Sequence, residues 1–161
     1  MFQPPSHADN PVEMNGAQPN SYLRNAVMQA SPEQLQLMLY DGAIRFALKG
    51  RQAILDNDPE ETYNALSRSQ KIVLEMDAGL KPEINKEVCE KMSALFNFVY
   101  RKLVNASVRR DASDIDDALK ILHHQRETWV ILMEKVSHLR AEEADGDLVQ
   151  TNREGPISVQ G

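Results

Sequence analysis

Residues 21–42 read SYLRNAVMQASPEQLQLMLYDG and contain the clearest helix start in the chain. Ser31 suits the N-cap, Pro32 suits the first helical position, and Gln34 can reach back to the cap. In the helix that follows, the apolar residues form two arcs instead of one stripe. One arc holds Leu35, Met38, Leu39, Gly42, Ala43, Phe46 and Ala53, and the other holds Leu37, Ile44, Leu48 and Leu55. A single neighbour cannot bury both arcs. The sequence therefore predicts either the middle helix of a bundle or a helix that keeps apolar surface for a partner.

Three more long helices are predicted from capping residues and apolar spacing. The first begins at Asp58 and runs to about Leu80, the second covers about residues 85–108, and the third starts at Ser113. Their apolar stripes are, in order, Leu66, Val73, Met76 and Leu80; Val88, Met92, Leu95, Val99, Leu103 and Ala106, flanked by Phe96, Tyr100 and Val104; and Ile115, Leu119, Leu122, Trp129, Met133 and Val136. Short connections make neighbouring helices antiparallel. We therefore predict an all-α fold, an antiparallel (up-down-up-down) four-helix bundle.

The bundle domain is expected over residues 20–140, between two disordered tails. Residues 1–19 and 141–161 are mostly polar and contain too little apolar surface to offset the entropy of ordering. Residues 22–28 form a short amphipathic N-terminal segment that caps the bundle, too short for an independent helix. We expect this segment to act as a gate over a binding groove.

Composition excludes several classes of function. The chain has 161 residues and a net charge of −6, which argues against nucleic-acid binding because phosphate neutralisation requires a basic face. The amino terminus has no basic and apolar signal pattern, and no apolar run approaches the length of a membrane span. Cys89 is the only cysteine, so an internal disulfide is excluded. We expect a cytoplasmic protein.

Catalytic and metal-binding patterns are lacking. His123, His124 and Glu127 lie within about one helical turn, and we interpret them as a solvated helix face rather than a weak metal site. Cys89 has neither a base nor an oxyanion donor marked near it, so a packed core thiol is the preferred interpretation. Trp129 is interpreted as core packing, with an interface anchor as the alternative. We expect no enzyme activity, no cofactor and no metal.

Several motifs along the chain together resemble one known family. They are Tyr22, Ala26-Val27-Met28, Ala30-Ser31-Pro32, Gln34-Leu35 and Met38-Leu39-Tyr40-Asp41-Gly42-Ala43, then Phe98-Val99-Tyr100-Arg101-Lys102-Leu103, Asn105-Ala106, Arg110-Asp111 and Thr128-Trp129. Over residues 22–136 this pattern resembles the FliS family, the flagellar export chaperones for flagellin. The resemblance implies a non-enzymatic, antiparallel helical bundle that binds the disordered C-terminal segment of flagellin in the bacterial cytosol. Such a protein prevents premature filament assembly and delivers flagellin to the flagellar type III export gate.

The binding surface is expected on the first long helix and the segment before it. The candidate residues are Tyr22, Val27, Leu35, Met38, Leu39, Asp41, Gly42 and Phe46. Gly42 indicates a close approach by another helix, from either the bundle or the client. Arg126 interrupts the last apolar stripe, so its guanidinium must reach solvent or an acid. The alternative function is that of a helical adaptor or anti-activator that binds a folded flagellar regulator.

Overall fold

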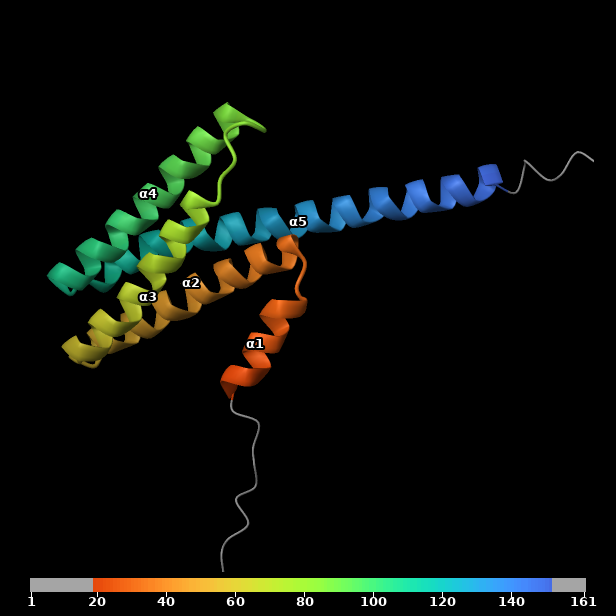
Figure 1. The fold of residues 1–161 in the computed structure, drawn as a ribbon. Helices are drawn as coiled ribbons and strands as arrows, with labels where there is room; N and C mark the ends of the chain where they lie inside the picture. Colours follow the sequence, from red (N-terminus) through yellow and green to blue (C-terminus); the bar gives the residue numbers. More distant parts are fainter. Residues whose placement is uncertain (1–18, 152–161) are drawn as a thin grey trace, which may run out of the picture. The chain divides into compact units, whose positions relative to one another are not determined.

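The computed structural model describes residues 19–151, which are helical apart from short connections. This confirms the all-α class. The structure contains five helices in this range where four long helices and a capping segment were predicted (Figure 1). They are α1 Pro19–Gln29, α2 Pro32–Leu55, α3 Pro59–Ala78, α4 Lys86–Arg109 and α5 Ala112–Thr151. The predicted disordered tail at residues 1–19 lies outside the described residues, except for Pro19.

The chain divides into two compact units between Ser31 and Pro32. The first unit contains α1, an 11-residue helix whose large apolar side chains Tyr22, Leu23, Val27 and Met28 are exposed. The second unit contains α2 to α5. The described residues that form the hydrophobic core cluster all belong to this second unit.

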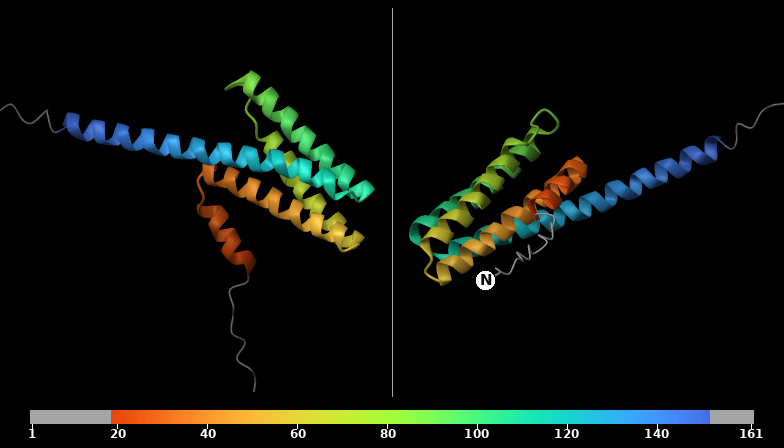
Figure 2. Two further views of the ribbon diagram at one scale, coloured as in Figure 1. Left: turned by 180° about the vertical axis from the view of Figure 1, so that it is seen from behind. Right: turned by 60° about the horizontal axis from the view of Figure 1, so that its bottom comes forward.

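Helices α2 to α5 surround one core. Helix α2 packs against α3 and α5, and α4 packs against the same two helices. The chain reverses direction at each short connection between them (Figures 1 and 2). Each helix supplies three or four buried residues to the core: Tyr40, Ala43, Ile44 and Ala47 from α2; Leu66, Val73 and Met76 from α3; Phe96, Val99, Leu103 and Ala106 from α4; and Ile115, Ala118, Leu119 and Leu122 from α5.

Local capping chemistry fixes most helix starts. The Asp58 carboxylate accepts from the Glu61 backbone N–H at 3.0 Å, as the sequence predicted, and Asn85 caps α4 by accepting from Val88 at 3.1 Å. The start of α5 differs from the prediction. Asp111, rather than Ser113, precedes the helix and accepts from both the backbone N–H and the hydroxyl of Ser113. The short connection from α4 is possible because Arg110 adopts a left-handed conformation.

The predicted apolar stripe of α4 is partly wrong. Val99 and Leu103 are buried as expected, but Val88 is 52% exposed and Leu95 is 37% exposed. Phe96, which was placed on the flank, is only 1% exposed, and its ring lies 6.4 Å from that of Tyr40. The buried face of α4, which packs against both α3 and α5, holds Phe96 together with Val99, Leu103 and Ala106, while Val88 lies in the first turn, beside the connection from α3.

Helix α5 extends further than the sequence predicted. Residues 141–151 are helical, whereas they were expected to belong to the disordered tail. Residues 141–150 are exposed, so local propensity rather than packing explains the helix. The stretch Ala141-Glu142-Glu143-Ala144 consists of strong helix formers, and continuing an existing helix requires no new nucleus. None of the described helices has a stretch long and apolar enough to cross a membrane.

Candidate interaction surface

Six of the eight predicted binding residues lie together on α2. Leu35, Met38, Leu39 and Phe46 are half-buried, Gly42 is buried and Asp41 is exposed. The other two, Tyr22 and Val27, lie on α1 in the first unit and are exposed. The surface of α2 therefore keeps some apolar side-chain area in contact with water, although the helix also supplies a large part of the core.

The glycines of α2 face α3. A Cβ atom added to Gly42 would lie 3.2 Å from Cδ1 of Ile72, so the close approach inferred from this glycine is made by α3 within the bundle. Gly50, which the sequence analysis did not single out, is packed more tightly. A Cβ there would lie 2.6 Å from Cγ of Leu66. Gly50 lies eight residues after Gly42 and close to the same face of the helix, and this spacing could have identified it from the sequence.

Phe46 is shielded by cations. The guanidinium groups of Arg45 and Arg68 lie over its ring, at 5.1 and 5.4 Å from the centroid. Arg68 belongs to α3, so this contact also joins the two helices across their surface. Because cation–π contacts cover the Phe46 ring, it is less available to a partner than the sequence suggested.

Three ion pairs and the hydrogen bond of the Trp129 indole connect α5 to α2, and one of the ion pairs joins Arg140 to Glu33 at 3.6 Å. Arg126 Nε donates to the Asp41 carboxylate. Arg126 interrupts the apolar stripe of α5, and of the two possibilities given by the sequence, solvent or an acid, its guanidinium reaches an acid. Arg51 Nε lies 2.7 Å from Asp116 Oδ1, and this hydrogen bond lowers the pKa of Asp116. Asp41, a predicted binding residue, is thus engaged within the second unit.

A pocket of about 360 Å³ opens where the α3–α4 connection meets the ends of the helices. We call it the loop-end pocket. Its lining is mainly apolar and comes from all four helices and the connection: Gln36, Tyr40, Met76, Gly79, Leu80, Lys81, Ile84, Asn85, Val88, Cys89, Met92 and Trp129. Ile84 is 78% exposed and Val88 is 52% exposed at this site. None of the eight predicted binding residues lines it.

The base of the loop-end pocket is well fixed. Tyr40 is 1% exposed, and burial raises the pKa of its phenol. Trp129 is half-buried against the core and donates its indole N–H to the Glu33 backbone carbonyl at 3.0 Å. The interpretation of Trp129 as packing is therefore correct, yet the same side chain also lines the pocket. This arrangement offers a preformed apolar surface with an exposed rim formed by Ile84 and Val88.

Metal-binding clusters do not occur among the described residues, where no group of three or more His, Cys, Asp or Glu side chains could hold an ion. His123, His124 and Glu127 are exposed on α5. Cys89 is half-buried and free.

Comparisons with known proteins agree on one family. The family model described as flagellar protein FliS matches residues 14–136. The flagellar secretion chaperone FliS of Salmonella typhimurium (strain LT2) is 33% identical over 116 residues, which cover 71% of this chain and 86% of the relative. The corresponding protein of Bacillus subtilis (strain 168) is 31% identical over 109 residues, covering 68% and 80%. A crystal structure of a flagellar chaperone from bacteria shares the fold, with a TM-score of 0.57 at 19% identity, covering 72% of this chain and 97% of that chain.

Proposed function

Since the chain belongs to the FliS family and is a flagellar secretion chaperone, we propose that its client is the C-terminal segment of flagellin. The observation that supports this client best is the open, apolar loop-end pocket. A disordered amphipathic segment that folds into a helix on binding needs such a surface to receive its apolar side chains.

In this proposal α2 to α5 act as an antiparallel, up-down-up-down bundle that remains rigid while the client becomes ordered. Ile84 and Val88 at the rim contact the first apolar residues of the client, and Trp129 and Met92 receive the residue that enters the pocket. Met92 adapts to different side chains because its thioether is flexible and polarizable. Leu35, Met38 and Leu39 provide a second apolar patch on α2, and Tyr22, Val27, Asp41, Gly42 and Phe46 remain candidates beside it.

The biological consequence follows from covering the apolar face of flagellin. A covered segment does not assemble prematurely, and the cost of ordering the client keeps the complex weak enough to release it. We place this activity in the bacterial cytosol, with delivery to the flagellar type III export gate. Binding is stoichiometric and involves no catalytic step, cofactor or metal.

The experiment that tests the client and the pocket is calorimetric titration with a synthetic peptide of the flagellin C-terminal segment, combined with circular dichroism. The variants are Ile84→Asp and Val88→Asp, and the matched control is Ile131→Asp, because Ile131 is 54% exposed on α5 and lies outside the pocket. We expect each pocket variant to weaken binding by about tenfold or more, which corresponds to about 1.4 kcal/mol.

The control variant should bind the peptide as the wild type does, and the peptide should gain helicity when it binds. Unchanged affinity in both pocket variants would exclude the loop-end pocket as the binding surface. A failure of the wild-type protein to bind the peptide, together with binding of a folded flagellar regulator, would instead favour the adaptor or anti-activator function.

A further inference from the structure

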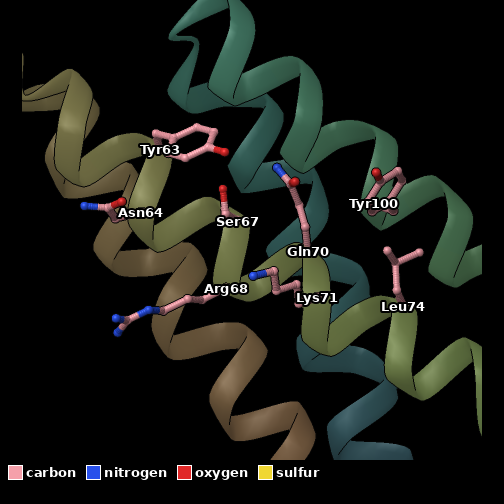
Figure 3. A pocket seen from close by; sticks show the side chains of 8 residues that line it. All are labelled: Tyr63, Asn64, Ser67, Arg68, Gln70, Lys71, Leu74 and Tyr100. Carbon is pink, nitrogen blue, oxygen red and sulfur yellow. The ribbon is translucent and has the colours of Figure 1, made fainter.

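A second concave surface runs along the outer side of α3, where Gln70 points toward α4 and the Arg68 guanidinium lies over α2 (Figure 3). We call it the α3–α4 groove. It has a volume of about 430 Å³ and is lined by Tyr63, Asn64, Ser67, Arg68, Gln70, Lys71, Leu74 and Tyr100. Tyr63 is 66% exposed and Leu74 is 45% exposed, so aromatic and aliphatic surface is available beside the polar groups. The groove and the loop-end pocket share no residue.

The charge of the α3–α4 groove is opposite to that of the whole chain. The chain carries a net charge of −6, yet the described lining of this groove contains two cations and no carboxylate. Arg68 stacks on Phe46 and Lys71 makes no ion pair, so neither cation has a carboxylate partner among the described residues. A ligand that fits this surface therefore carries carboxylates next to apolar side chains.

The C-terminal part of α5 carries these groups. Residues 137–150, the α5 extension, are exposed throughout and include the apolar residues Leu139, Leu148 and Val149. Glu142, Glu143 and Asp145 have no ion-pair partner among the described residues. Spacings of three, four and three residues place Leu139, Glu142, Gly146 and Val149 on one face of the helix.

Gly146 gives a second indication that another polypeptide contacts this face. A glycine within a helix costs about 1 kcal/mol relative to alanine. The cost is unexplained within the described part of the chain, where nothing lies within 4 Å of the position that a Cβ would occupy. A glycine on the same face as Leu139 and Val149 would let a docked helix approach closely.

The lengths of the groove and of the α5 extension, together with the direction of α5, determine whether the extension can reach the groove of its own chain or only that of another copy. From Tyr63 to Leu74 the groove follows about 17 Å of α3, and the 14 residues of the extension span about 21 Å at a rise of about 1.5 Å per residue. Figure 1 shows α5 continuing straight beyond the ends of the other three helices of the second unit. The extension cannot turn back onto α3 of its own chain unless the helix breaks.

We propose that the α3–α4 groove binds the α5 extension of a second copy of this chain. Arg68 and Lys71 pair with Glu142 and Glu143, while Leu139 and Val149 pack against Leu74 and the tyrosine rings. Each copy has one groove and one extension, so two copies can exchange extensions and close a twofold dimer with two equivalent contacts. Because the contact is made by exposed charges, the dimer weakens as salt increases.

Charge reversal on each side tests this arrangement in the full-length chain. Sedimentation equilibrium would be measured over a range of concentrations for the wild type, for Arg68→Glu with Lys71→Glu, and for Glu142→Lys with Glu143→Lys. The matched control for the first pair is Lys120→Glu with Lys135→Glu, two exposed lysines of α5 that make no ion pair. Circular dichroism verifies that every variant is folded.

We expect the wild type and the control to dimerise and each charge-reversed variant to lose about tenfold or more in dimer affinity. An equimolar mixture of the two charge-reversed variants should recover heterodimers through the restored opposite charges. A wild-type chain that stays monomeric at all concentrations would overturn the proposal. Dimers that both reversals leave unchanged would overturn it as well, since another surface would then hold them. Neither result depends on flagellin binding, so this test is separate from that of the loop-end pocket.

Discussion

Trp129 on α5 donates its indole N–H to the backbone carbonyl of Glu33 in the first turn of α2, across 3.0 Å. The two residues are 96 positions apart, so this hydrogen bond holds the end of α2 against α5 beside the loop-end pocket. Trp129 is also the only tryptophan of the chain. Its fluorescence therefore reports specifically on this end of the bundle.

Replacing Trp129 with Phe should destabilise the fold and weaken client binding. The ring still fills part of the apolar site, but the hydrogen bond from the indole N–H to the Glu33 carbonyl is lost, which costs about 1 kcal/mol. Urea unfolding followed by circular dichroism measures the loss of stability. The control is Tyr100→Phe, because the Tyr100 hydroxyl has no hydrogen bond among the described residues and its removal should leave the unfolding midpoint nearly unchanged. Equal midpoints for all three proteins would show that the indole hydrogen bond contributes nothing.

Gln125 should be replaceable by Leu with a gain in stability. This side chain is only 6% exposed on α5, and neither its amide nitrogen nor its amide oxygen has a hydrogen-bond partner among the described residues. A buried polar group without a partner costs about 1–3 kcal/mol, so an apolar side chain of similar size should raise the urea midpoint. Gln52→Leu on the exposed side of α2 is the comparison and should change stability by less than about 0.5 kcal/mol. A lower midpoint for Gln125→Leu would reveal that the amide is satisfied in solution.

Replacing Gly42, Gly50 or Gly146 by alanine should change the stability or the helicity of the protein by different amounts. Gly50→Ala should destabilise the fold by about 1–3 kcal/mol because the added methyl group overlaps Leu66. Gly42→Ala should cost less, since its methyl group meets only the flexible end of Ile72 at 3.2 Å. Gly146→Ala should increase the helicity of the α5 extension, where the position is open. Thermal unfolding and circular dichroism measure these effects, and a stabilising Gly50→Ala substitution would contradict the close packing of α2 on α3.

The stability of the fold should depend on pH partly through Asp116. The hydrogen bond from Arg51 lowers the pKa of this carboxyl in the folded state. The contribution of Asp116 to the free energy of unfolding is therefore complete above the ordinary carboxyl pKa of about 4, and it is lost as the pH falls below that value. The effect is small, because both side chains are more than one third exposed. Between pH 7 and pH 3 the urea midpoint of Asp116→Asn should fall less than that of the wild type.

Arg51→Gln provides the matching variant, because it removes the cause of the lowered pKa and leaves the carboxyl in place. Its pH profile should resemble that of Asp116→Asn. Two different profiles would indicate that Asp116 interacts mainly with other groups, such as Lys120.

Features decided by neighbouring residues were predictable from the sequence. The cap at Asp58 needs only the backbone N–H of Glu61, three residues later, and α3 ends at Ala78, close to the predicted end near Leu80. The stripe residues Leu66 and Val73 are buried because their spacing alone places them on one face. The start of α5 was misplaced by one residue. Asp111 and Ser113 are both good capping residues, and only the left-handed turn at Arg110 selects Asp111.

The binding surface was less predictable because it is assembled from distant segments. The loop-end pocket combines α2, α3, α4, α5 and a connection. The spacing of residues along a single helix cannot predict where these separate segments meet. Phe46 looked like an available apolar residue, but Arg68 of α3 covers it. Asp41 looked available as well, and Arg126 of α5 binds it. The sequence indicated that Arg126 had to reach either solvent or an acid, and only the structure identifies Asp41 as its partner.

Removing residues 1–29 should leave the second unit folded and change its affinity for flagellin. None of the described residues of α1 belongs to the core cluster, so the shortened protein should still unfold in one cooperative transition. The deletion removes Tyr22 and Val27, the two predicted binding residues outside α2. If residues 22–28 act as a gate, the flagellin peptide should bind more tightly to the shortened protein; if they contact the client directly, it should bind more weakly. Calorimetric titration of both proteins decides between these outcomes. Tyr22→Ser with Val27→Ser in the full-length chain should reproduce the same direction of change, whereas loss of the cooperative transition on deletion would make the segment part of the core and refute the gate.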